Sequence, residues 1–226
     1  MTIEKMKEYN LTAMTTSTSA SNAIFAAKRR YDEQTQEVRK SPHFTAEGRG
    51  YKISQIRSQI ETELKAEIEK LRTQYDEATE KARETAREIL TTTKHPEPSD
   101  GEKALFEREL TDLKTKLMLE IRYNSAMQLI SEFEQKYADG YYATALLDQM
   151  PAFIEQVVAL ADNKDEARTN LRRMYSALSD RAKTDEQREA EALLAYDKAP
   201  MLSRAGAEYR VLIDIFGAYE ASNLTQ

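Results

Sequence analysis

The side chains that could do acid–base or metal chemistry are few and widely separated. The chain has only two histidines, His43 and His95, and each stands beside a proline in a predicted turn. A metal site needs several ligands at helical or turn spacing, and the nearest carboxylates, Glu47 and Glu97, have the pattern of ordinary surface residues. Helical di-metal sites take histidine from Glu-x-x-His pairs within long helices. We therefore interpret both histidines as exposed loop residues and expect no bound metal.

The usual motifs for nucleophilic catalysis and phosphate binding are missing from the sequence. It has no cysteine, no glycine-rich phosphate loop and no G-x-S-x-G motif. Its many carboxylates stand three or four residues from Lys or Arg, a spacing typical of solvated pairs that stabilise helices. We predict a protein that is not an enzyme and has no cofactor.

A group of basic residues is the first candidate for binding a partner. It comprises Lys28, Arg29, Arg30, Arg39 and Lys40. Residues 1–57 hold ten Lys or Arg against six Asp or Glu, whereas residues 58–226 hold 23 against 33. This balance disfavours nucleic acid as a general partner and favours an acidic protein surface. The other interpretation is a solvated basic face that neighbouring carboxylates balance.

The aromatic group around Tyr141 and Tyr142 is the second candidate. It also includes Tyr137, Met150 and Phe153. Tyrosine and methionine are frequent in protein interfaces. The same residues also hold substructures together, and their place between two predicted substructures favours that packing role. Tyr141 and Tyr142 remain candidate partner-binding residues.

The composition indicates that helices position these groups. Charged residues make up 32% of the chain and hydrophobic residues 40%, and only six residues are glycine, which is typical of a helical protein. The longest predicted helix spans 45–91, with Thr45 as its candidate N-cap. An apolar stripe with a mean spacing of about 3.6 residues predicts a nearly straight helix. The stripe consists of Ile53, Ile56, Ile60, Leu64, Ile68, Leu71, Tyr75, Ala78, Ala82, Ala86 and Ile89.

We predict that this helix folds back on the next one as an antiparallel hairpin over 45–137. The stretch 91–101 contains two prolines and a glycine and predicts the turn, and Ser99 with Glu102 matches a capping box. Small alanines then face bulky side chains, which lets helices approach closely. The register pairs Ile89 with Leu105 and Ile60 with Phe133, and sets Ala78, Ala82 and Ala86 opposite Leu117, Leu113 and Phe106.

The remaining segments complete an all-α fold. Residues 1–20 are predicted as a flexible arm, because 12–22 is rich in Ser and Thr and lacks apolar periodicity. A basic helix at 21–41 follows, with Ser21 as candidate N-cap, and ends at Ser41-Pro42. Residues 141–226 are predicted as a compact helical domain with one core. Its helices are expected at 142–149, 151–161, 164–182, 185–197 and 200–220, with cap-like pairs at Asn163–Glu166 and Thr184–Gln187.

Residues 43–82 resemble a pattern in helical proteins of tailed-phage structural gene clusters. That pattern starts with Tyr or Phe, then Thr-x-Glu-Gly, and continues as a charged helix with Ile or Leu every three or four residues. Here the start is Phe44-Thr45-Ala46-Glu47-Gly48. A hairpin and a smaller helical domain follow in those proteins. The resemblance implies a head-associated or scaffold-like role and transfers no catalytic residue.

We therefore expect a non-enzymatic structural or assembly protein of a tailed phage, located in the bacterial cytoplasm or the virion. Its partner would be a capsid or other virion protein, or a second copy of itself. One alternative is a cytoplasmic helical adaptor that binds a host protein through 141–220. Another is a nucleic-acid-associated protein that uses the basic segment 21–57. We expect no membrane role, because no secretory signal pattern and no run of about 18 apolar residues is present.

Overall fold

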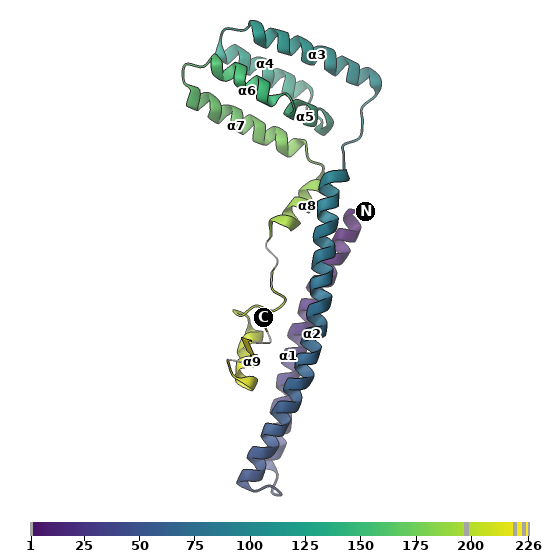
Figure 1. Cartoon of the computed structure of the whole chain (residues 1–226), viewed down its shortest axis with the longest axis vertical. Coiled ribbons are helices and arrows are strands. Elements are labelled where there is room, and N and C mark those ends of the chain that lie inside the picture. The colour runs from purple at the N-terminus through teal and green to yellow at the C-terminus, as the bar shows by residue number, and fades with distance from the viewer. Residues whose placement is uncertain (1, 197–198, 219–220, 223–224, 226) are drawn as a thin grey trace. The chain divides into compact units, whose positions relative to one another are not determined.

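The computed structural model of the chain describes residues 2–196, 199–218, 221–222 and 225. Every regular element within these residues is a helix, so the all-α fold class is confirmed (Figure 1). The chain divides into unit 1, Met1–Glu88 with Ala192–Gln226, and unit 2, Ile89–Glu191. The helices are α1 (Ile3–Lys40), α2 (Ala46–Thr92), α3 (Asp100–Leu119), α4 (Tyr123–Lys136), α5 (Gly140–Leu147), α6 (Met150–Ala159), α7 (Lys164–Arg181), α8 (Asp185–Ala195) and α9 (Ala207–Phe216).

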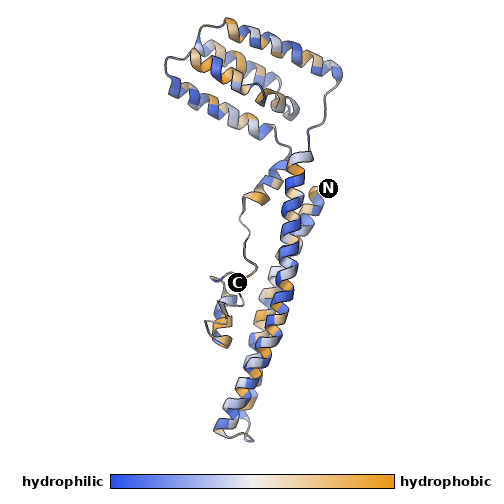
Figure 2. Ribbon diagram, in the orientation of Figure 1, coloured by the Kyte–Doolittle hydropathy of each residue, from blue (hydrophilic) through white to orange (hydrophobic). Residues whose placement is uncertain are grey.

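In unit 1, α1 and α2 lie side by side as a long antiparallel hairpin closed by the loop 41–45 (Figure 1). The backbone N–H of Ser41 donates to Glu37 O at 3.0 Å where α1 ends, and the Thr45 hydroxyl accepts from Gly48 N at 3.1 Å where α2 begins. Both helix ends lie where the sequence predicts them. Apolar residues recur along α2 among polar ones (Figure 2). Its stripe shares one core with α1, formed by Ile56, Ile60, Leu64, Ile68, Ala13, Ala20, Ile24, Ala27 and Val38.

The first helix corrects the prediction of a flexible arm. α1 continues without a break through the Ser/Thr-rich segment 12–22, so Ser21 is not an N-cap. Most hydroxyls of this segment, those of Thr12, Thr15, Thr16, Thr18 and Ser19, donate to carbonyls one turn back; that of Thr16, for example, donates to Thr12 O at 2.8 Å. Such a bond gives the hydroxyl a partner within its own helix, so Ser and Thr can occupy helical positions. Small residues at helical spacing, Ala13, Thr16 and Ala20, are buried here, and they form no pattern of large apolar side chains in the sequence.

The partner of α2 in the hairpin also differs from the prediction. The predicted second helix is interrupted, because Glu120 and Arg122 have extended backbone conformations that end α3 and precede α4. The Glu120 carboxylate accepts the N–H of Ile121 at 2.9 Å and that of Arg122 at 3.0 Å, which stabilises the interruption. Ile60 therefore packs in the core with α1, whereas Phe133 belongs to a separate core in unit 2. The structure thus contains a long helical hairpin, but α1 and α2 form it, not α2 and the helix that follows.

The predicted compact domain at 141–226 is divided between the two units. Helices α5, α6 and α7 belong to unit 2, whereas α9 and the segment before it pack on the hairpin of unit 1. Polar side chains hold that segment by its carbonyls: Ser17 donates to Met201 O at 2.7 Å and Tyr75 to Ala199 O at 2.7 Å. The residues that α9 and its flanks add to the core are Met201, Leu202, Leu212, Ile215, Phe216 and Ala221.

Unit 2 is a bundle of short helices around its own core. Its predicted caps are confirmed: Ser99 and Glu102 form the reciprocal capping box of α3, and Asn163 Oδ1 accepts Glu166 N at 3.2 Å. The helices α5, α6 and α7 lie within a few residues of the predicted positions, because these local signals fix helix starts. The core consists of Phe106, Leu110, Leu113, Leu117, Ala126, Ile130, Phe133, Tyr137, Ala143, Leu146, Met150, Phe153, Val157, Leu171 and Leu178.

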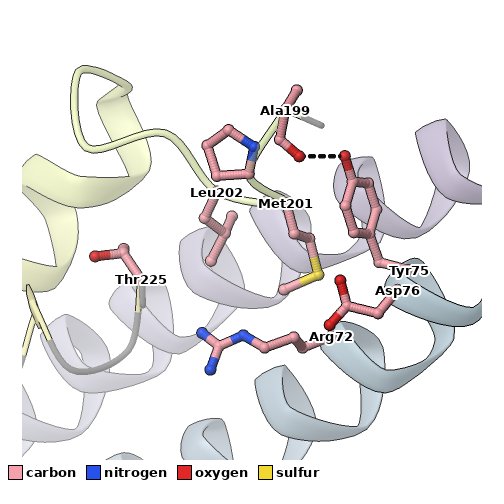
Figure 3. A pocket seen from close by; sticks show the side chains of 8 residues that line it. Arg72, Tyr75, Asp76, Ala199, Met201, Leu202 and Thr225 are labelled. Atoms are coloured by element: carbon pink, nitrogen blue, oxygen red, sulfur yellow. Dashed lines mark hydrogen bonds between the residues drawn. The ribbon is translucent and has the colours of Figure 1, made fainter. Parts of the chain in front are cut away.

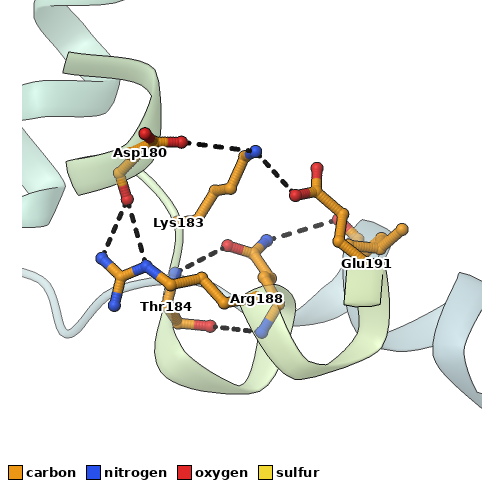
Figure 4. Close-up of polar contacts among 7 residues, drawn as sticks. Asp180, Lys183, Thr184, Arg188 and Glu191 are labelled. Atoms are coloured by element: carbon orange, nitrogen blue, oxygen red, sulfur yellow. Dashed lines mark hydrogen bonds and ion pairs between the residues drawn. The ribbon is translucent and has the colours of Figure 1, made fainter. Parts of the chain in front are cut away.

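The corner between α7 and α8 is built from side chains that bind backbone groups (Figure 4). Thr184 and Gln187 form a reciprocal pair at the start of α8, with bonds of 3.0 and 3.2 Å. The Gln187 Nε2 also donates to Leu90 O at 3.3 Å and Thr93 O at 3.0 Å, carbonyls that the end of α2 leaves without helical partners. Arg188 donates twice to Asp180 O at the end of α7. The short helix α8 thus binds the C-terminal ends of α2 and α7.

Replacing Ala20 by leucine should destabilise unit 1. Ala20 is 0% exposed in the core of α1, α2 and α9, so a larger side chain forces these helices apart. We expect Ala20→Leu to lower the free energy of unfolding by about 1–3 kcal/mol. Ala26→Leu is the matched control, because Ala26 lies on an exposed part of the same helix. Urea denaturation followed by circular dichroism measures both, and equal stability of the two variants would contradict the packing.

Replacing Gln187 by alanine should destabilise unit 2. The change removes the bonds from one side chain to Thr184 N, Leu90 O and Thr93 O. We expect a loss of about 1–3 kcal/mol in the free energy of unfolding, because partly buried backbone groups lose their partners. Gln135→Ala, at an exposed position of α4, should change stability by less than about 0.5 kcal/mol. The comparison fails if urea denaturation gives the same midpoint for both variants.

Candidate interaction surfaces

The five predicted basic residues do not act as one group. Lys28 pairs with Asp32 on its own helix at 2.8 Å, and Arg30 pairs with Glu63 of α2 at 2.7 Å. Hydrogen bonds from Gln59 and from Arg30 lower the pKa of Glu63. Arg30 therefore serves the hairpin itself. Arg29, Arg39 and Lys40 are exposed, and within the described part of the chain no carboxylate lies at ion-pair distance from them.

The closed end of the hairpin gathers Arg39 and Lys40 with two cations from the start of α2, Arg49 and Lys52. Arg49 donates to Ser41 O at 3.1 Å, so its guanidinium lies against the end of α1. The described residues place no carboxylate at ion-pair distance from any of the four cations. Two aromatic residues of the same end are accessible: Tyr51 is 70% exposed and Phe44 36%. We call these six residues the basic tip.

The sequence-based prediction includes two of the four cations of the basic tip and neither aromatic residue. Arg39 and Lys40 are among the predicted partner-binding residues, whereas Arg49, Tyr51 and Lys52 fall within the predicted long helix and Phe44 precedes it. The available signal was the turn at Pro42, because a turn between two helices brings the end of the first beside the start of the second. Basic residues on both sides of such a turn must share one surface.

The predicted aromatic group lies mostly inside unit 2. The Tyr142 ring packs against Phe106 in a tilted arrangement, with ring centroids 4.8 Å apart, and edge-on against Tyr137 at 5.1 Å. Tyr141 is partly buried, with its ring edge-on to Tyr142 at 5.4 Å and Lys103 at 5.8 Å from its centroid. Offset and edge-on pairs of this kind stabilise a core beyond their buried area. The packing interpretation of this group therefore has direct geometric support, and a partner-binding role for Tyr141 and Tyr142 stays a prediction.

One polar cluster borders these rings. The Tyr137 hydroxyl donates to Glu109 Oε2 at 3.0 Å, and Lys136 bonds to Glu109 Oε1 at 2.6 Å. Burial, then the bond to the Glu109 carboxylate, raises the pKa of Tyr137 from 10.0 to about 12. The bonds from Lys136 and Tyr137 lower the pKa of Glu109. These shifts favour the neutral phenol beside an ionised carboxylate, which is a structural arrangement.

Unit 2 exposes a compact group of large apolar side chains where α3 ends. Met118, Leu119 and Ile121 are 70%, 77% and 80% exposed, and they flank the extended residue Glu120. We call these three residues the apolar corner. On α1 of unit 1, Leu11 and Met14 stand one turn apart and are 61% and 62% exposed. Large apolar side chains are usually buried, and contiguous exposed ones mark interaction sites.

A hollow of about 280 Å³ lies in unit 1 where the segment before α9 crosses α2 (Figure 3). Its polar side is formed by Arg72, Tyr75 and Asp76. The Tyr75 hydroxyl is bonded to Ala199 O, and both charged residues have interactions of their own. Since Met201 and Leu202 on its other side belong to the core, we assign this hollow to packing of the segment.

The two histidines have different surroundings. His43 is exposed in the loop of the hairpin, in agreement with its prediction. His95 corrects its prediction, because it is partly buried and its Nε2 lies 3.0 Å from Ala182 O. The ring also occupies the space that a β-carbon at Gly140 would need. His95 thus fixes the connection between α2 and α3 against two other helices of unit 2.

Neither the local chemistry nor comparisons with known proteins identify a reaction. Within the described residues, no three His, Asp or Glu side chains form a group able to hold a metal ion. The helices described include none that is both long enough and apolar enough to cross a membrane. No family model matches the chain, and neither a curated protein nor a solved structure matches it. The candidate sites are therefore surfaces, the basic tip and the apolar corner.

The Tyr137 cluster should make stability depend on alkaline pH. Because the folded-state pKa of Tyr137 is raised to about 12, its contribution is complete below pH 10.0 and is lost as pH rises toward 12. We expect Tyr137→Phe to weaken this decline, since phenylalanine does not ionise. Urea midpoints between pH 9 and 12 measure the effect, with Tyr175→Phe at an exposed position of α7 as control. An unchanged alkaline decline in Tyr137→Phe would contradict the assignment.

Proposed function

We propose that this chain is a non-enzymatic structural or assembly protein that acts through helix-mediated contacts with other proteins. The observation that carries the proposal is the apolar corner, where three large side chains lie mostly in solvent. Solvation of such side chains is unfavourable by about 1.5–3 kcal/mol each relative to full burial. A protein partner that covers them would recover part of that free energy.

A second apolar surface supports the same function. Leu11 and Met14 project from α1 on the side opposite its buried stripe, since the core side of the helix carries Ala13, Thr16 and Ala20. Each unit therefore presents apolar side chains that its own core does not use. A protein with one such surface on each unit is suited to joining other proteins.

The resemblance of residues 43–82 extends this proposal to tailed-phage assembly. In that form, the chain is a head-associated or scaffold-like protein of the bacterial cytoplasm or the virion. Its partner is a capsid or other virion protein, or a second copy of the chain. The position of the gene tests this extension, because a location far from capsid genes would remove the phage role and leave the general assembly role intact.

The alternative is a cytoplasmic helical adaptor that binds a host protein through 141–220. The structure divides this range between units 1 and 2, so an adaptor would use the part of the range in one unit or the other.

A photo-crosslinking amino acid at position 119 should capture the partner of the apolar corner in cells that make the protein. We expect one discrete product, a virion protein or a second copy, and no product from position 107, which is exposed on the same helix. With the purified partner, Leu119→Ser/Ile121→Ser should weaken binding at least about tenfold, or 1.4 kcal/mol, because it removes two apolar contacts. Unchanged affinity of this variant, or no product from position 119, would contradict the proposal.

A further inference from the structure

We infer that the basic tip binds single-stranded nucleic acid through its four cations and its two exposed aromatic rings. This goes beyond the proposed contacts with other proteins, which depend on the apolar corner in unit 2. The tip belongs to unit 1, so the two surfaces can be tested by separate variants.

The positive charge of the tip favours a polyanion as its ligand. Residues 39–52 contain four Lys or Arg and one carboxylate residue, Glu47. Of the other basic residues that the sequence suggested, Lys28 and Arg30 are neutralised by Asp32 and Glu63, and only Arg29 is exposed without a carboxylate partner among the described residues. The four cations of the tip therefore form the larger group of positive charge. Cations that no carboxylate neutralises attract phosphates and release counterions from them. Arg39, Lys40 and Lys52 are exposed, and Arg49 is partly buried against Ser41 O.

The aromatic rings favour single-stranded nucleic acid over a duplex or an acidic protein. Tyr51 and Phe44 are exposed at the same end of the hairpin as the cations. The carboxylates of an acidic protein helix would pair with the cations but would leave the faces of these two rings in contact with water. Bases of a single strand stack on aromatic rings and gain about 1–3 kcal/mol each, regardless of sequence. A duplex keeps its bases stacked inside, so it would use the cations alone. The combination of cations and free rings therefore favours a single strand.

The footprint must be short. Beyond the tip, residues 53–70 of α2 carry Glu61, Glu63, Glu67 and Glu69 against Arg57, Lys65 and Lys70, so this part of α2 has no excess of positive charge that would extend the contact with a strand. Contacts are thus limited to the four cations. With about four phosphates neutralised, a rise in KCl from 50 to 200 mM should weaken binding of a single strand about 50-fold.

Fluorescence anisotropy on the full chain tests the inference. The probe is a labelled oligothymidylate of about 16 nucleotides, with oligouridylate and a duplex of the same length measured beside it. We expect saturable binding of the single strand with a slope of log affinity against log salt near about −2.8. The tighter of the two single strands identifies DNA or RNA as the polymer.

Variants separate the charges from the rings. Arg39→Gln/Lys40→Gln should reduce the salt slope by about 1.4. Tyr51→Ala should weaken single-strand binding about fivefold or more at unchanged slope, and should leave duplex binding unchanged. Tyr51→Phe keeps the ring and should bind like the unaltered chain, whereas Glu47→Gln should bind more tightly because it removes the carboxylate of the tip.

Matched controls lie elsewhere on the protein. Tyr196→Ala alters another highly exposed tyrosine, and Arg172→Gln/Arg173→Gln alters two adjacent exposed cations of α7. Neither should change the affinity. The inference is overturned by absence of single-strand binding at about 50 mM KCl, or by losses in the controls as large as those in the tip variants. Equal competition by poly-L-glutamate at the same charge concentration would also overturn it, and would assign the tip to an acidic protein.

Discussion

One face of α1 is made of small side chains, and the packing of unit 1 depends on it. Ala13, Thr16, Ala20 and Ala27 leave room on this face for two neighbours, the stripe of α2 and the segment that contains α9. Small residues permit close approach of helices, and the larger side chains of the neighbours then fill the space without voids. Ile24, a large residue of the same face, is fully buried among them. The C-terminal segment can therefore join the N-terminal hairpin although most of the chain separates them in sequence.

Helix ends provide the second type of connection. The last carbonyls of a helix lack partners within it, and in this chain polar side chains from distant segments bind such groups. Gln187 binds the carbonyls at the end of α2, and Arg188 binds one at the end of α7. In unit 1, Ser17 binds the carbonyl of Met201, which lies in the non-helical segment before α9. These bonds are directional, so they specify where a segment ends, whereas apolar packing specifies only which faces meet.

This difference explains what the sequence predicted and what it did not. The caps at Ser99, Asn163 and Thr184 depend on residues three positions apart, and all three are confirmed because local geometry determines them. The partner of α2 depends on distant residues, and its stripe was compatible with either neighbouring helix. The Ser/Thr-rich face of α1 was overlooked because burial of Thr16 and Ala20 leaves no large apolar pattern. Only two of the four cations of the basic tip, Arg39 and Lys40, are predicted from the sequence, since the cations come from both sides of a turn.

The two proposed surfaces differ in the force that drives binding, and this has consequences for how the chain would work. The contacts proposed for the cations of the basic tip would be electrostatic and would weaken steeply with salt, whereas those proposed for the apolar corner would depend on burial of apolar area and respond little to salt. The tip lies in unit 1 and the corner in unit 2, so neither surface requires the other for its own geometry. A chain with both properties would hold a protein partner persistently and a nucleic acid reversibly. That combination is what an assembly protein needs if it must remain attached to one component while another is still being positioned.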